Sequence, residues 1–325
     1  MKTKIVVTTH LPGDPIKRLR AHDAGREAEI VHLDNQRVAT RKELLAAVPG
    51  ATAILSELPD QIDEEVFDTA TDSLKVVANY GVGFDNVDVA TARDRGIVVT
   101  NTPNVLTEST ADVAWLLMLM AARGALSANA DINADRWHGW HPSTYIGADC
   151  VDKTLFIIGM GRIGLAVARR TIGWPMKVIY NARTPKPEAE AAPINAKRVD
   201  LDEGLAQADF VSLHCPLTPE TKHLIDAKKL ALMKTTSILI NTARGLVVDE
   251  QALVDALQNE TIYAAGLDVY EGEPHIHPGL RDNPRATLLP HIGSGSESSR
   301  TRMTKVAVEN LLAVLSGKTP PNRVV

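Results

Sequence analysis

Short apolar runs rich in valine and isoleucine alternate with amphipathic stretches along most of the chain. This alternation is typical of a parallel β-sheet covered by α-helices. In the first hundred residues it predicts helices near 14–21, 40–47, 62–70 and 88–95, and strands at Lys4–Thr8, Glu29–Leu33, Ala53–Glu57, Lys75–Asn79 and Ile97–Thr100. The predicted fold class is therefore α/β, beginning with a doubly wound unit of five strands.

A second series of strands and helices is expected after a long apolar helix from Leu106 to Arg123, which Thr107 is available to cap. The second series predicts strands at Thr154–Ile158, Lys177–Asn181, Phe210–His214, Ser237–Asn241, Tyr263–Val269 and Thr287–Pro290. A last helix is expected over 297–315, because Ser316, Gly317 and prolines follow it. The segment Thr184–Pro193, rich in Pro, Ala and Glu, is expected to be a loop.

Composition narrows the class of protein. Hydrophobic residues make up 44% and charged residues 23% of 325 residues, which suits two globular domains. No run reaches the length of a membrane span, and the N-terminus has an apolar run of only three residues, too short for a signal peptide, so we expect a cytoplasmic protein without a membrane partner. A net charge of −5 without basic clusters argues against a nucleic-acid partner. With only Cys150 and Cys215, no disulfide framework is expected.

A glycine-rich turn directly follows the predicted strand Thr154–Ile158. Gly159-Met160-Gly161-Arg162-Ile163-Gly164 fits G-x-G-x-x-G between a strand and a helix. The first glycine permits the turn, the second lets a pyrophosphate approach the backbone, and the third lets helix and strand pack closely. The helix N-terminus adds free N–H groups for the phosphates. These six residues predict a dinucleotide site.

The residue after the next strand indicates which dinucleotide is preferred. An acidic side chain there binds the ribose hydroxyls of NAD, whereas an arginine accommodates the 2′-phosphate of NADP. Nineteen residues after Gly164 the chain has Arg183, between Asn181 and Thr184, and no acid precedes Glu188. We therefore expect a preference for NADPH, with NADH still able to bind through the glycine turn.

Several separated motifs resemble the D-isomer-specific 2-hydroxyacid dehydrogenase family, most closely its glyoxylate/hydroxypyruvate reductase branch. They are the glycine turn, Asn79-Tyr80-Gly81-Val82-Gly83-Phe84-Asp85-Asn86-Val87-Asp88, His214-Cys215-Pro216-Leu217-Thr218-Pro219-Glu220-Thr221, Ile240-Asn241-Thr242-Ala243-Arg244-Gly245, Ala265-Gly266-Leu267-Asp268-Val269 through Glu273-Pro274, and Pro290-His291-Ile292-Gly293-Ser294. The resemblance covers nearly the whole chain.

The resemblance implies two doubly wound domains with an unusual connectivity. A Rossmann cofactor domain, residues 100–291, would be inserted in a flavodoxin-like substrate domain made of 1–99 and 292–325. It also implies a homodimer in which the apolar helix about 106–123 packs against its twin, and in which Trp137 and Trp140 reach the partner's active site. The implied activity is reduction of glyoxylate and hydroxypyruvate to glycolate and D-glycerate.

Three residues match the family's catalytic positions. His291 suits the role of general acid, because the pKa of histidine lies near neutrality. A carboxylate at Glu273 would favour the protonated imidazole and fix its orientation. Arg244 offers a planar fork of donors for the substrate carboxylate and for the charge that develops on the ketone oxygen. Backbone N–H groups at Val82 and Gly83 are implied to bind the same carboxylate.

Further cofactor contacts follow from the same motifs. Cys215 and Pro216 match positions that line the nicotinamide site, although Cys215 is assigned no covalent role, and Asp268 matches the position that meets the carboxamide. The remaining implied contacts are Thr221, Thr242, Ala243, Arg244, His291, Gly293 and Ser294. No metal is expected, because neither His138–His141 nor His275–His277 has the acidic or cysteine residues of a usual site nearby.

The chain departs from the family's sequence pattern at two places. Phe156 stands where many relatives have glycine, and Gly295–Ser299 departs from the more usual Ala-Thr run, so the start of the last helix is expected to differ.

Four functions are alternatives to the implied activity. Formate dehydrogenases of this fold have Gln where Glu273 stands, and phosphite dehydrogenases have Lys where Val82 stands. A larger 2-keto acid, such as a keto-sugar acid or a phenylpyruvate, stays open as the substrate. A dinucleotide-sensing co-repressor is less consistent with a chain that stops soon after its last helix.

Overall fold

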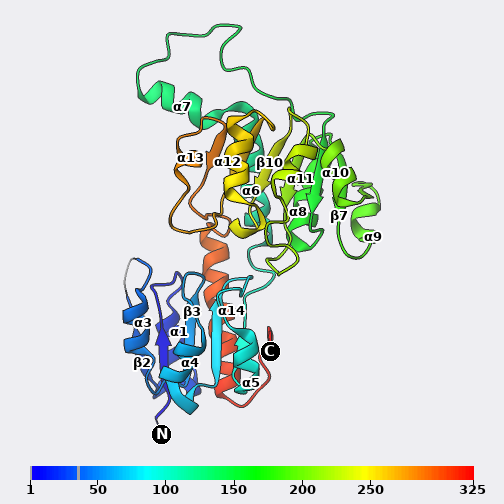
Figure 1. The fold of residues 1–325 in the computed structure, drawn as a ribbon. Helices are drawn as coiled ribbons and strands as arrows, with labels where there is room; N and C mark the ends of the chain where they lie inside the picture. The colour runs from blue at the N-terminus through cyan, green and yellow to red at the C-terminus, as the bar shows by residue number, and fades with distance from the viewer. Residues whose placement is uncertain (1, 35–36) are drawn as a thin grey trace. The chain divides into compact units, whose positions relative to one another are not determined.

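The computed structural model describes residues 2–34 and 37–325, and the chain folds as two compact units (Figure 1). Unit 1 contains the residues up to Leu106 together with Gly295–Val325, and unit 2 is Thr107–Ser294. The sequence placed the boundaries at 99/100 and 291/292, a few residues before those of the units. That unit 1 binds the substrate and unit 2 the cofactor stays a prediction.

Unit 1 is a five-stranded parallel sheet of order β2-β1-β3-β4-β5. Its strands are β1 (Lys4–Val7), β2 (Glu29–His32), β3 (Ala53–Glu57), β4 (Val76–Tyr80) and β5 (Val98–Thr100). Its helices are α1 (Pro15–Arg20), α2 (Asp23–Arg26), α3 (Arg41–Ala47), α4 (Glu64–Ala70), α5 (Val89–Asp94) and α14 (Glu297–Leu315). The 2-1-3-4-5 strand order is that of flavodoxin-like sheets.

Apolar side chains explain why these segments form a sheet between helices. Ile54 and Val77 on the central strands and Phe67 on α4 are fully buried in one cluster. The long helix α14 packs on β3, β4 and β5, although its residues follow unit 2 in the sequence. The unusual segment before α14 supplies its cap, because the Ser296 hydroxyl accepts a hydrogen bond from Ser299 N at 3.2 Å.

Unit 2 is a seven-stranded sheet of order β12-β11-β10-β9-β6-β7-β8, parallel throughout. Its strands are β6 (Thr154–Ile158), β7 (Lys177–Asn181), β8 (Lys197–Arg198), β9 (Phe210–Leu213), β10 (Ile238–Asn241), β11 (Ala264–Leu267) and β12 (Ala286–Leu288). Its helices are α6 (Thr107–Arg123), α7 (Ala125–Asn133), α8 (Arg162–Arg170), α9 (Pro187–Glu190), α10 (Leu201–Gln207), α11 (Ala227–Leu232), α12 (Glu250–Gln258) and α13 (Pro278–Arg281). The turn α9 lies inside Thr184–Pro193, so the expectation of an irregular loop there was wrong in part.

The strand order of unit 2 reverses between β6 and β9, which defines where a ligand binds. Successive strands are added outward from β6 to β8 on one side and from β9 to β12 on the other. In doubly wound sheets the crevice at the carboxyl ends of such strands takes the ligand.

The departure at Phe156 is accommodated in the core, because a Cβ on Gly204 of α10 would lie 2.3 Å from the Phe156 ring. The absence of a side chain at Gly204 therefore makes room for the phenyl ring.

The helix α6 packs on α8, β10 and β11, and α7 continues from it into the exposed segment 134–146, which projects from the rest of unit 2 (Figure 1). No single helix among the described residues is long and apolar enough to span a bilayer. Taken together α6 and α7 pass that test of length and composition, but they meet at a bend of 67°.

Candidate active site

The glycine turn lies at the carboxyl end of β6 and leads into α8, as the motif predicts. Gly159 has a φ of +96°, and a Cβ there would lie 2.5 Å from Cys215 N, so both its conformation and its surroundings require glycine. A Cβ on Gly164 would lie 2.3 Å from the Gly159 carbonyl oxygen, which shows how closely α8 packs on the turn. A Cβ on Gly161, in contrast, would meet no atom within 4 Å. Gly161 thus leaves open backbone where a pyrophosphate can approach.

Other residues of the predicted cofactor set fit this arrangement. The Thr242 hydroxyl, after β10, is buried and has no hydrogen-bond partner within the described residues, so a polar ligand group can satisfy it. Met160 is buried in the core, whereas Arg162 is exposed and Ile163 is half-buried at the start of α8. These observations fit a dinucleotide, which supplies a hydride when it is bound in its reduced form.

Arg183 lies in the exposed loop after β7, at the place predicted for a 2′-phosphate. Arg198 on β8 fixes that loop, since its Nε donates to Ala182 O at 3.0 Å and its Nη2 to Arg183 O at 3.1 Å. Asn181 Nδ2 donates to Val199 O at 3.1 Å, and Thr184 is exposed. The sequence did not identify Arg198, because a two-residue polar strand has no apolar run that would reveal it.

The strongest catalytic feature is the contact of His291 with Glu273. His291 Nδ1 lies 2.7 Å from Glu273 Oε2, and both side chains are about one-third exposed. Burial alone would raise the pKa of Glu273, but the hydrogen bond and charge of His291, the Tyr270 N–H and the charge of Arg244 together lower it. An ionised carboxylate can only accept, so Nδ1 carries the proton in this contact and Nε2 is the nitrogen available to a substrate.

Arg244 follows β10 on a turn that Asn241 organises. Asn241 Nδ2 donates to Arg244 O at 2.8 Å, and Asn241 Oδ1 accepts from Ala243 N at 2.9 Å. A Cβ on the next residue, Gly245, would lie 1.9 Å from the Tyr270 carbonyl carbon. The turn that carries Arg244 therefore packs directly on the backbone that leads to Glu273. The structure brings Arg244, Glu273 and His291 together at the carboxyl edge of one sheet.

Asp268 binds backbone in the structure. Its two carboxylate oxygens accept from Ile292 N and from Gly293 N, both at 2.7 Å. Burial raises the pKa of Asp268, while these N–H groups and the charge of His291 oppose the rise. Asp268 therefore fixes the segment just after His291, and its predicted contact with the carboxamide stays a prediction. The half-buried Ser294 follows this segment.

The residues after β9 form a tight turn next to the glycine motif. Burial raises the pKa of the Cys215 thiol to about 11, which agrees with giving it no covalent role. The Thr221 hydroxyl donates to Pro216 O at 2.7 Å and accepts from Thr218 N at 2.8 Å, so Thr221 shapes the turn. Pro216 itself is exposed.

Val82 and Gly83 lie in unit 1, on the turn that follows β4. Both are half-buried, and the carbonyl oxygen of each is held by an asparagine side chain, Asn101 for Val82 and Asn79 for Gly83. The sequence predicted the turn but not these asparagines.

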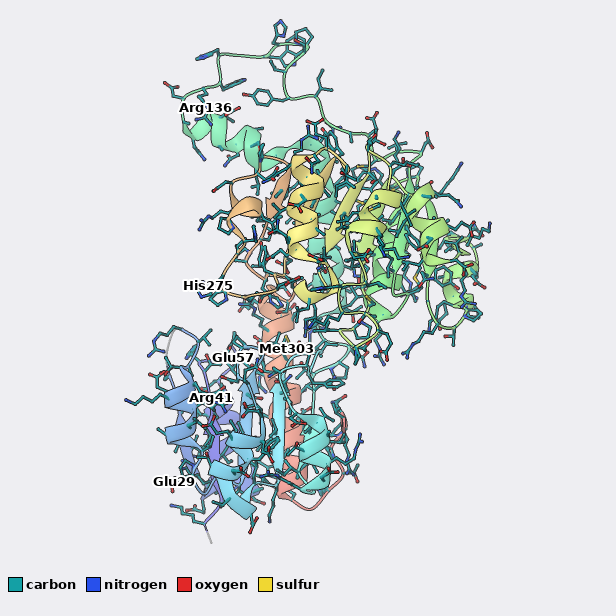
Figure 2. All side chains as sticks on the ribbon, viewed as in Figure 1. Glu29, Arg41, Glu57, Arg136, His275 and Met303 are labelled. Carbon is teal, nitrogen blue, oxygen red and sulfur yellow. The ribbon has the colours of Figure 1, made fainter. Side chains whose placement is uncertain are left out.

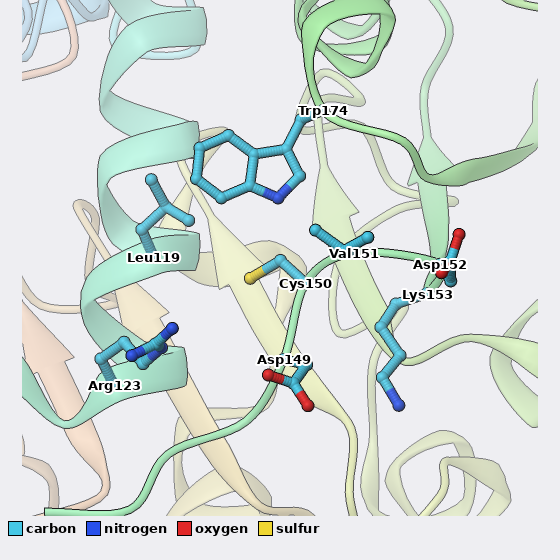
Figure 3. A pocket seen from close by; sticks show the side chains of 8 residues that line it. All are labelled: Leu119, Arg123, Asp149, Cys150, Val151, Asp152, Lys153 and Trp174. Carbon is cyan, nitrogen blue, oxygen red and sulfur yellow. The ribbon is translucent and has the colours of Figure 1, made fainter.

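Two further features of the described residues lie outside the candidate catalytic set. A pocket of about 580 Å³ is lined by Leu119, Arg123, Asp149, Cys150, Val151, Asp152, Lys153 and Trp174 (Figure 3). It adjoins the start of β6, whereas the catalytic residues follow the ends of strands, so it is not the substrate site. In unit 1, His10, His32 and Asp34 lie close enough together to hold a metal ion, with His10 Nδ1 2.8 Å from Asp34 Oδ1. Residues so far apart in sequence gave no recognisable metal motif.

Comparison with known proteins agrees with this geometry. Residues 115–293 match the family model described as "D-isomer specific 2-hydroxyacid dehydrogenase, NAD binding domain". A glyoxylate reductase of Thermococcus onnurineus is 43% identical over 328 residues, which cover 100% of this chain and 96% of that protein. A solved structure from Thermus thermophilus is 46% identical with a TM-score of 0.90, covering 99% of this chain and 100% of that one.

A further solved structure contains a cofactor. It is an NADPH-dependent glyoxylate/hydroxypyruvate reductase of Sinorhizobium meliloti in complex with NADP and malonate. The two chains are 33% identical with a TM-score of 0.85, and the match covers 100% of this chain and 97% of that one.

The class of protein is thereby defined as an oxidoreductase that uses a nicotinamide dinucleotide. This chain belongs to the D-isomer-specific 2-hydroxyacid dehydrogenase family, in the branch of the glyoxylate reductases. It is a 2-keto acid reductase.

Proposed function

We propose that the protein reduces glyoxylate and hydroxypyruvate to glycolate and D-glycerate, that it prefers NADPH, and that His291 is the general acid. The contact of His291 Nδ1 with the ionised Glu273 at 2.7 Å carries the proposal, because it leaves Nε2 to serve the substrate. A larger 2-keto acid is the alternative substrate, and the same residues would act on its keto-acid end.

The residues divide the reaction between them. Nε2 of His291 gives its proton to the carbonyl oxygen as that oxygen gains negative charge, and the imidazole regains a proton from solvent. Glu273 stabilises the protonated imidazole and holds its ring in place. Arg244 binds the substrate carboxylate through its planar fork and stabilises the charge on the ketone oxygen. We also propose that the N–H groups of Val82 and Gly83 are donors for a substrate carboxylate.

The preference for NADPH rests on Arg183. A 2′-phosphate carries nearly two negative charges, and a guanidinium can bind it with two hydrogen bonds. The bonds from Arg198 hold Ala182 O and Arg183 O and so order the loop before the ligand arrives. Glu220, whose pKa is lowered by the Thr218 hydroxyl and to a smaller extent by the charge of Arg183, is the acidic neighbour that opposes a phosphate here.

A homodimer completes the proposal. The segment 134–146 is exposed along its length and carries large apolar side chains that a monomer leaves in water, including Trp140, 84% exposed, and Ile146, 71% exposed. Leu116 on α6 is exposed as well. Such a surface is typical of a protein–protein contact. A twin chain packed on α6 and on this segment would cover it and bring Trp137 and Trp140 to the partner's active site.

The experiment is an NADPH and NADH oxidation assay with glyoxylate, hydroxypyruvate and phenylpyruvate. We expect the highest kcat/KM with the two small acids and NADPH. Arg183→Ala should raise the KM for NADPH about tenfold or more, since a charge-assisted bond contributes about 1.5–3 kcal/mol, and should leave NADH nearly unchanged.

Two further variants sharpen the cofactor test. Lys197→Ala, at the exposed residue before Arg198 on β8, should change the KM for neither cofactor. Glu220→Gln should lower the KM for NADPH. Equal efficiency of the wild type with both cofactors would refute the preference. A much higher kcat/KM for phenylpyruvate would favour the larger substrate. Light scattering that gives the 35.1 kDa of one chain would refute the dimer.

A further inference from the structure

Every carbonyl oxygen of the turn Gly81-Val82-Gly83 is held by another part of unit 1. Gly81 O accepts from Thr102 N at 2.8 Å. Val82 O accepts from Asn101 Nδ2 at 2.8 Å, and Gly83 O accepts from Asn79 Nδ2 at 2.8 Å. Two of these three anchors are asparagine side chains outside the turn itself.

Planar peptide geometry also fixes the direction in which the N–H groups of this turn point. In a trans peptide the C=O and the N–H of the next residue point in opposite directions. Anchoring the three carbonyl oxygens therefore points the N–H groups of Val82, Gly83 and Phe84 away from the anchors. None of the three N–H groups donates to another of the described residues. Phe84, the third donor, is 38% exposed.

The Asn79 amide is itself held by buried neighbours. Its Oδ1 accepts from Ser56 Oγ at 3.2 Å and from Asn86 Nδ2 at 3.1 Å. These two donors oblige the NH₂ group of Asn79 to face Gly83 O. Asn86 Nδ2 also lies within hydrogen-bond distance of Glu57 O and Asp60 O, which ties the turn to the segment after β3. Because Asn79 and Ser56 are fully buried, water cannot replace these bonds.

We propose that Asn79 and Asn101 are positioning residues that present the N–H groups of Val82, Gly83 and Phe84 as a three-donor site for the substrate carboxylate. The inference rests on the proposed role of Val82 and Gly83, and it adds Phe84 as a donor and the two asparagines as the groups that orient the site. A carboxylate has about four lone-pair positions and can accept from all three N–H groups. Donors fixed beforehand bind it without the cost of ordering the loop.

The test compares a keto acid with its uncharged methyl ester. Wild type, Asn101→Ala and Asn79→Ser are assayed with glyoxylate and with methyl glyoxylate at saturating NADPH. Ser73→Ala is the matched control, because it removes a hydroxyl in unit 1 that donates to Ala51 O and Ala70 O but no group that holds the turn. Circular dichroism and the Kd for NADPH, from its fluorescence, report whether each variant is folded and binds the cofactor.

The result expected is a loss of discrimination. In both asparagine variants the ratio of kcat/KM for glyoxylate to that for the ester should fall about tenfold or more, as expected for a lost charge-assisted bond. The fall should come from KM, with kcat within about threefold of the wild type. The Kd for NADPH and the ratio in Ser73→Ala should stay near wild-type values. A merely structural asparagine would affect acid and ester alike.

An unchanged ratio in folded variants would overturn the inference. If Asn79→Ser fails to fold, the ratio measured with Asn101→Ala decides the test. Asn101 is half-buried, and that variant keeps the hydrogen bonds of its backbone. If the wild type reduces another 2-keto acid better than glyoxylate, the comparison uses that acid and its methyl ester. Failure of the small-substrate proposal is thereby kept separate from failure of this one.

Discussion

Glu57 offers a test of the electrostatics of unit 1. This side chain, labelled in Figure 2, ends β3 and is half-buried, and its Oε1 has no hydrogen-bond partner among the described residues. Burial, and then the charge of Asp60, raise its pKa from 4.5 to about 7, although the Thr9 hydroxyl partly opposes them. We predict that Glu57→Gln, which keeps the shape and removes the ionisation, stabilises unit 1 at neutral and alkaline pH.

The sign and size of the effect follow from proton linkage. Below pH 4.5 the carboxyl is protonated in both folded and unfolded chains, so its ionisation costs nothing. Between pH 4.5 and about 7 the unfolded chain ionises while the folded one resists, and stability is lost as pH rises. The ceiling of that loss is about 3.4 kcal/mol, and solvent screening of a half-buried group reduces it to roughly 1–2 kcal/mol.

The assay is urea unfolding at pH 5, 6, 7 and 8, with hydrogen exchange of β3 and β4 peptides as the probe of unit 1. The difference between Glu57→Gln and wild type should grow from pH 5 to pH 7 and then level off. Glu43→Gln is the control in the same unit: its pKa is lowered to about 2 by Arg37 and by the N-terminal cap of α3. The contribution of Glu43 is therefore constant above pH 5. A difference for Glu57→Gln that is as large at pH 5 as at pH 8 would refute the reasoning.

Three predictions concern catalysis and the cofactor. His291→Ala should lower kcat by about 10²–10⁴-fold, and near-normal turnover would remove the residue from catalysis. Glu273→Gln should lower kcat, because the protonated imidazole loses its charged partner; an unchanged kcat would contradict this role. Gly161→Ala should leave Tm unchanged but weaken NADPH binding about tenfold or more, whereas Gly164→Ala, whose Cβ would meet backbone, should lower Tm. Equal effects of the two glycine variants would contradict the proposed phosphate contact.

Much of the fold could be predicted, because buried strands leave continuous apolar runs. Ala53–Glu57 and Lys177–Asn181 coincide with strands β3 and β7 of the structure. The strand β8 was missed, since Lys197 and Arg198 are charged and form only an edge. The helix α7 was missed too, because its residues Ala125–Asn133 include no buried side chain and have no capping side chain before them.

The part of the candidate site that lies in local sequence motifs could be predicted. The glycine turn and the positions of Arg244, Glu273 and His291 each follow a strand end that the sequence shows. The role of Asn101 in holding the turn at Val82 could not be found in this way, since Asn101 lies nineteen residues along the chain from the carbonyl it binds. Arg198 likewise acts across a turn, fifteen residues from Arg183 O. Hydrogen bonds between distant segments depend on the fold, and one sequence does not display them.

The position of His291 shows how a local sequence motif and hydrogen bonds between distant segments act together. Its backbone is in the left-handed region, with φ +52°, which costs a non-glycine residue about 1–2 kcal/mol. The chain stays in this conformation because Asp268 accepts hydrogen bonds from the next two N–H groups, those of Ile292 and Gly293, at 2.7 Å each. Each such bond to a carboxylate contributes about 1.5–3 kcal/mol, so the pair outweighs the strain. The same segment after β11 also supplies Glu273, which orients the imidazole. One stretch of chain therefore places both the backbone and the ring of the proposed general acid, and the motifs at Asp268–Glu273 and at His291 act as a single unit.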